Sequence, residues 1–148
     1  MNISQIRPFY MYIKKNKLNI YIYYIIYIMT DNLNIARFNQ LLTVSNPDKV
    51  KKNLKKYIPK DTPELFISNR KNKKYMILNP ITNKFIHFGS LAYEDFTKHN
   101  DKERQKNYII RASNIKGDWR PDKYSPNNLS LYLLWNYNSN INYKLKYD

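Results

Sequence analysis

The stretch from Lys73 to Asn136 constrains the fold of this chain more than any other feature. It holds both glycines, both histidines and both tryptophans, together with the clearest turn and helix-capping signals of the sequence. Turns and caps at short intervals are typical of short elements that share one small core. The whole chain has 148 residues, the usual length of one domain. We therefore expect one modest core, because a chain of this length does not bury two.

Three short apolar runs predict a small antiparallel meander of two or three strands. The runs are Leu65–Ile67, Tyr75–Leu78 and Phe85–Phe88, and polar turns over 69–72 and 79–83 separate them. In places the strands are apolar on both faces, which predicts that helices cover one face of the sheet.

The residues before the meander predict a basic helical arm. Residues 31–42 fit a short helix, and Asn46 with Pro47 then forms a start signal before the run DKVKKNLKKYI. Apolar residues of this run share one helix face, lysines occupy the rest, and Pro59 is a stop signal. The predicted class is α+β: residues 29–59 form the arm, 60–137 the meander packed by two or three helices, and 138–148 a frayed tail.

Helices are also expected after the meander. Asn100 and Glu103 have the spacing of a capping box, and Gly117 is a natural helix stop. Ser125 and Pro126 begin a last helix. The apolar residues expected on the inward faces of these two helices are Tyr108, Ile109, Ala112, Ile115, Leu129, Tyr132, Leu133 and Trp135.

Charge is the main indication of a partner. The chain has 26 Lys and Arg against 11 Asp and Glu, a formal charge of +15. Such an excess predicts a polyanion: DNA, RNA or an acidic membrane surface. Abundant Asn, Ile, Lys and Tyr, which have AT-rich codons, offer an alternative in which the basic charge reflects genome composition. The absence of cysteine excludes disulfides and thiolate metal sites.

The first 28 residues contain no acid and precede a second plausible start at Met29. We prefer the interpretation that residues 1–28 are upstream sequence translated from a misassigned start codon. A short hydrophobic anchor and a genuine element such as a β-strand are the alternatives. The apolar run 18–29 is shorter than the roughly 20 residues that a spanning helix needs. A membrane is a partner only if this segment is genuine.

One group of residues allows a catalytic hypothesis. A strand histidine, His87, followed by Glu94, Asp95, His99 and Asp101 resembles the ligand set of metal-dependent nucleases of the ββα type, although the spacing does not match well. Local roles explain the same residues, because His87 would pack at a strand end and the acids would favour helix N-termini. No phosphate-binding loop or nucleophile motif occurs. We therefore expect no enzyme, catalytic residue, cofactor or metal, with His87, His99 and Asp101 as the remaining candidate ligands.

The segment 73–136 also resembles a family of small, basic, uncharacterised proteins of large double-stranded DNA viruses, with relatives in some phages. The residues that carry the resemblance are Lys74–Met76, Ile86–Gly89, Tyr93–Thr97, His99, Asp101, Arg104, Tyr108, Arg111, Trp119, Ser125–Pro126 and Leu133–Trp135. The family has no established activity to carry over. The resemblance implies a viral source and a place in the virion or in the virus factory of the host cytoplasm.

These observations predict a non-enzymatic, virion-associated protein that binds DNA or RNA non-specifically through phosphate contacts. The expected nucleic-acid-binding residues are Lys51, Lys52, Lys55, Lys56, Arg70, Lys71, Lys73, Lys74, Arg104, Arg111 and Trp119. Trp119 fits two roles equally, a lid over the sheet or a contact residue. The alternative function is a protein-interaction or capsid-cement module that contacts virion proteins and whose charge is incidental. No small-molecule substrate is expected.

Overall fold

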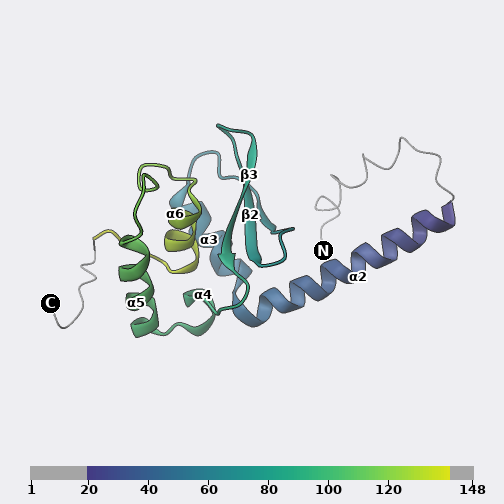
Figure 1. The fold of residues 1–148 in the computed structure, drawn as a ribbon, viewed down its shortest axis with the longest axis horizontal. Coiled ribbons are helices and arrows are strands. Elements are labelled where there is room, and N and C mark those ends of the chain that lie inside the picture. Colours follow the sequence, from purple (N-terminus) through teal and green to yellow (C-terminus); the bar gives the residue numbers. More distant parts are fainter. Residues whose placement is uncertain (1–19, 141–148) are drawn as a thin grey trace. The chain divides into compact units, whose positions relative to one another are not determined.

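A computed structural model of the chain describes residues 20–140, which fall into two units that divide between Asn39 and Gln40. We call the residues from Gln40 onward the main unit. The elements are α2 (Ile20–Val44), α3 (Pro47–Tyr57), β1 (Leu65–Ile67), β2 (Lys73–Asn79), β3 (Lys84–Ser90), α4 (Phe96–His99), α5 (Lys102–Ser113), α6 (Pro126–Leu129) and η2 (Ser130–Leu134) (Figure 1). The predicted α+β class is confirmed.

Residues 1–28 are predicted to be translated upstream sequence or a short anchor, and most of this segment lies outside the described residues. Residues 20–28 belong to α2, so the strand alternative is wrong for this part. A helix satisfies its own backbone hydrogen bonds, whereas a lone strand leaves them unpaired. No helix within residues 20–140 is long and apolar enough to cross a membrane.

The three strands form one antiparallel sheet in the order β1-β2-β3. Phe66 pairs with Met76, and Met76 pairs in turn with His87. Because side chains alternate between the two faces of a strand, this register also places Tyr75 beside Phe88 on the opposite, inner face. β2 and β3 extend further than the apolar runs predict, because their ends continue the pairing from Lys73 to Asn79.

One core joins the inner face of the sheet to α3, α5, α6 and η2. Its members include Tyr75, Ile77 and Phe88 from the sheet. The α3 residues Val50 and Leu54 are at most 1% exposed and belong to the same cluster. α3 is therefore part of the main unit, which begins at Gln40, well before the boundary predicted at residue 60.

Two of the three predicted helix N-caps are confirmed, and the third lies one position further along the chain than predicted. Asn46 caps α3, and Ser125 caps α6 by accepting a hydrogen bond from Asn128 N. Asn100 ends α4 with a left-handed backbone, φ 55°, and Asp101 caps α5. The predicted capping box is thus wrong, because Asn100 is used to stop the preceding helix.

The last two predicted helices also differ in length from expectation. α5 ends at Ser113, so Ile115 lies beyond it and is 48% exposed, not inward-facing. α6 continues into η2, a π-helix in which Trp135 N donates to Ser130 O. This wider turn lets the neighbouring Leu133 and Leu134 both be buried.

Candidate nucleic-acid interface

Helix α3 presents lysines on a rigid support. Its apolar face, with Val50 and Leu54, is buried. Asn53 Nδ2 donates to Leu133 O over 2.8 Å, which ties the helix to η2. Packing and a side-chain hydrogen bond both fix the helix. The backbone of the lysines on its other face is therefore held in a defined position on the main unit.

The exposed face of α3 is strongly basic. It carries four exposed lysines that make no hydrogen bond or ion pair with any described residue; they are Lys51, Lys52, Lys55 and Lys56. Lys49 is on the same helix but is not among the predicted contact residues; its Nζ donates to Asn100 Oδ1 over 3.1 Å. With Asp48 as the one acid, the helix has five cations and one anion, a net charge of 5 − 1 = +4. We name Lys49, Lys51, Lys52, Lys55 and Lys56 the α3 basic face.

An aromatic pair stands at the C-terminal end of this helix. The rings of Tyr57 and Tyr132 are stacked with centroids 4.3 Å apart, and Tyr132 also meets Tyr137 edge-on. Tyr57 Oη donates to Lys123 O over 3.1 Å. Burial, with Tyr132 as the next cause, raises the pKa of Tyr57 to about 12, so its hydroxyl stays protonated at neutral pH. The expected core role of Tyr132 is confirmed in part, because its ring packs against the core but is only half-buried.

The other predicted contact residues come from different elements. Arg70 and Lys71 are exposed in the turn between β1 and β2, and Lys73 is half-buried at the start of β2. On α5, Arg104 Nη1 lies 3.3 Å from Glu94 Oε2, and the Arg111 guanidinium stands 5.4 Å from the centre of the Tyr108 ring. The predicted set is therefore spread over α3, the turn between β1 and β2, β2 itself, α5 and the loop after α5.

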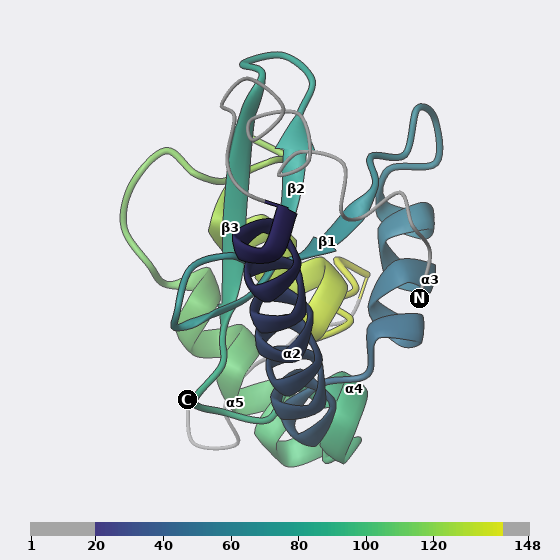
Figure 2. The ribbon, with the colours of Figure 1, turned by 90° about the vertical axis from the view of Figure 1, so that its right-hand side faces the viewer.

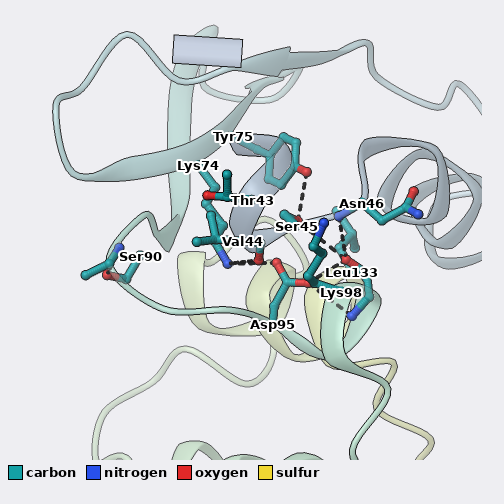
Figure 3. A network of polar contacts seen from close by, with 12 residues as sticks. Thr43, Val44, Ser45, Asn46, Lys74, Tyr75, Ser90, Asp95, Lys98 and Leu133 are labelled. Carbon is teal, nitrogen blue, oxygen red and sulfur yellow. Dashed lines mark hydrogen bonds and ion pairs between the residues drawn. The ribbon is translucent and has the colours of Figure 1, made fainter. Parts of the chain in front are cut away.

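Lys74 is a correction to the predicted set. Its side chain is 2% exposed and its Nζ lies 2.8 Å from Asp95 Oδ2, with a further bond of 3.1 Å to Val44 O (Figure 3). Burial lowers the pKa of Lys74, although Asp95 opposes that shift. A side chain held in this way does not reach a phosphate. Its sequence neighbours gave no sign of this, because the partner Asp95 lies 21 residues away.

The same buried network joins four segments of the main unit. Tyr75 Oη donates to Ser45 Oγ over 2.9 Å (Figure 3). Thr97 Oγ1 accepts a bond from Asn46 N over 2.9 Å. Asp95 caps α4 by accepting from Thr97 N. Each of these groups is buried or half-buried and has a partner, as buried polar groups require. The network thus fixes where α2 ends and α3 begins relative to β2 and α4.

The candidate metal ligands have separate local roles. His87 Nδ1 lies 2.8 Å from Ser68 Oγ, while His99 Nδ1 accepts from Asp101 N over 2.9 Å. Backbone bonds from Arg104 and Glu103 lower the pKa of Asp101, which fits its role as a helix cap. Among the described residues, no three His, Asp or Glu side chains lie close enough together to hold a metal ion.

Trp119 has a structural attachment. Its Nε1 donates to Ile115 O over 2.7 Å, and its ring is half-buried and packs against the core. The Arg120 guanidinium stands 4.6 Å from the ring centre. The ring is therefore held between the loop and the core, with one cation beside it, so it has a packing role in the fold.

Comparison with known proteins finds one family. A family model described as "Family of unknown function (DUF5754)" matches residues 64–112, which span the sheet, α4 and most of α5. No curated protein and no solved structure matches the chain. The matched segment is thus similar to an uncharacterised family, and it excludes the α3 basic face.

Proposed function

We propose that this protein binds nucleic acid without sequence specificity and that the α3 basic face makes its main phosphate contacts. The observation that carries the proposal is the arrangement of Lys51, Lys52, Lys55 and Lys56: all are exposed, none is neutralised by a described residue, and their helix is anchored in the core. Free ammonium groups on one rigid helix suit a row of phosphates.

The chemistry of this surface favours contact with the backbone of a nucleic acid over readout of its bases. Lysine is a point charge with a flexible stem, and it recognises phosphate without the planar fork that arginine offers to a base. α3 contains lysine as its only type of cation. Binding through this helix is therefore expected to tolerate any sequence and to weaken steeply with salt.

Paired substitutions test the proposal. The variant K52Q/K55Q removes two charges from the α3 basic face, and K106Q/K116Q removes two from α5 and the loop after it. Each variant is titrated into labelled duplex DNA at low ionic strength. The proposal predicts weaker binding for K52Q/K55Q than for K106Q/K116Q. Equal losses would mean that only net charge matters, and they would overturn the assignment to α3.

We also propose that the protein acts in virus particles or in the virus factory. The support is the resemblance of residues 73–136 to proteins of large double-stranded DNA viruses, combined with the charge of +15, which suits a compartment filled with nucleic acid. Mass spectrometry of purified particles, with and without nuclease treatment, tests this setting. Absence of its peptides from particles and from factories would contradict it.

A further inference from the structure

The sheet of the main unit has one face that the core does not use. Phe66, Met76 and Phe85 alternate along their strands with core residues, and none of the three packs against the core cluster. In Figure 2 the strands lie side by side with α6 behind them. We call Phe66, Met76, Leu78, Phe85 and His87 the outer sheet face.

Rings dominate this outer sheet face. Phe66 and Phe85 meet edge to face with centroids 6.0 Å apart, and Phe85 is 46% exposed. His87 is half-buried on the same face, in register with Met76. The exposed part of the Phe85 ring is apolar, and contact with water does not stabilise it. It is therefore available to an aromatic or apolar partner.

The segment that forms the three strands carries charge of one sign. Residues 65–90 contain five cations and no acid, and Lys74 among them is buried against Asp95 from outside this segment. Arg70 and Lys73 lie close enough to His87 for their charges to contribute to lowering its pKa, after burial as the larger cause. An apolar patch on strands whose segment, residues 65–90, carries positive charges alone fits a partner that combines flat rings with negative charge.

We propose that the outer sheet face stacks the bases of single-stranded nucleic acid, with Phe85 as the main platform and Arg70 and Lys73 holding the adjacent phosphates. Unpaired bases expose flat surfaces to a sheet, whereas bases in a duplex are already stacked on one another. This inference rests on the proposed nucleic-acid binding and adds a substrate class to it. The α3 basic face would bind duplex and single strands alike, whereas the outer sheet face would bind single strands alone.

The test uses the whole chain, an oligothymidine strand and a duplex of equal length. Phe85→Leu keeps an apolar side chain but removes the ring, and Phe85→Tyr keeps the ring. We expect Phe85→Leu to weaken binding of the single strand by about tenfold, in line with the loss of one stacked base, and to leave duplex binding unchanged. Phe85→Tyr should bind both as the native protein does. Ile81→Ala, at a 79%-exposed apolar position in the turn between β2 and β3, is the matched control and should change neither affinity.

The outcomes separate this inference from the proposal on α3. If Phe85→Leu binds the single strand as tightly as the native protein while K52Q/K55Q binds it less tightly, the stacking role is overturned and the α3 assignment stands. If Phe85→Leu alone weakens the single strand, the stacking role stands and the α3 assignment falls. Equal losses for Phe85→Leu and Ile81→Ala would indicate a general apolar surface and would also overturn the stacking role. Circular dichroism of each variant confirms that the affinities compare folded proteins.

Discussion

Lys74 and Asp95 form an ion pair of 2.8 Å in which both side chains are 2% exposed. The pair joins β2 to the start of α4, and the additional bond from Lys74 Nζ to Val44 O brings in the end of α2. A charge this deeply buried is tolerated only with its partner in place. Among the residues that the structure describes, the most buried cation of this very basic chain therefore serves the fold.

The ion pair predicts a strong asymmetry between single and double substitutions. Lys74→Met leaves Asp95 charged and unpaired, and we expect it to lower the free energy of unfolding by about 3 to 5 kcal/mol. K74M/D95N removes both charges and keeps a residue that caps helices well, so it should cost much less. Urea unfolding of both variants measures the difference, and equal losses would show that the pairing of the charges is unimportant.

Gly89, which lies beside Lys74, is a second position at which substitution should lower stability. Its φ is +73°, and an added Cβ would lie 2.7 Å from Leu134 Cδ1 and 3.3 Å from Lys74 Cβ. Gly117 also has positive φ, +112°, but its surroundings are open. Gly89→Ala should therefore lower the melting temperature more than Gly117→Ala, since it adds a steric clash to the backbone strain. The same loss in both variants would contradict this packing.

The histidines predict that stability depends on pH. Burial lowers the pKa of both His87 and His99, and the charges of Arg70 and Arg104 respectively lower it further. The unfolded chain therefore takes up protons below about pH 6.5 that the folded chain binds less readily, so stability is lost as the pH falls through this window. Unfolding at pH 5.5 should need less urea than at pH 7.5. In an NMR titration, Arg70→Gln should raise the pKa of His87 and leave that of His99 unchanged.

Removing the N-cap of α6 should lower the free energy of unfolding by less than breaking the Lys74–Asp95 pair does. Ser125 Oγ accepts from Asn128 N over 3.2 Å, and Ser125 is buried. Ser125→Ala should lower the free energy of unfolding by about 1 kcal/mol, whereas Ser125→Asp retains an acceptor and should cost less. Thermal unfolding with Ser139→Ala, an exposed site, as control measures both. An Ala variant as stable as the control would show that the cap contributes nothing.

Local signals predicted most of the fold. Asn46 with Pro47 and Ser125 with Pro126 start helices where expected, and the apolar run 65–67 is a strand with those bounds. Such signals work because a cap or a turn depends on a few neighbouring residues. Asn100 misled because it offers both a capping side chain and a left-handed backbone, and sequence alone does not say which one the chain uses.

The candidate site was predicted less completely. The lysines of α3 followed from helical periodicity, and the structure places them on one exposed face. The burial of Lys74 depends on Asp95 and Val44, which are distant in sequence. The basic residues around Lys74 therefore did not indicate that it is buried. The outer sheet face likewise depends on the pairing register that sets Phe66 and Phe85 beside each other.

The most direct test of the account is the salt dependence of binding to duplex DNA. The slope of log affinity against log salt concentration changes by about 0.9 for each phosphate that a cation neutralises, so Lys51, Lys52, Lys55 and Lys56 together would give a slope on the order of −3 to −4. We predict a slope of this size for the native protein, shallower by about 2 in K52Q/K55Q and unchanged in K106Q/K116Q. A flat response in the native protein, or an unaltered slope in K52Q/K55Q, would contradict phosphate binding by the α3 basic face.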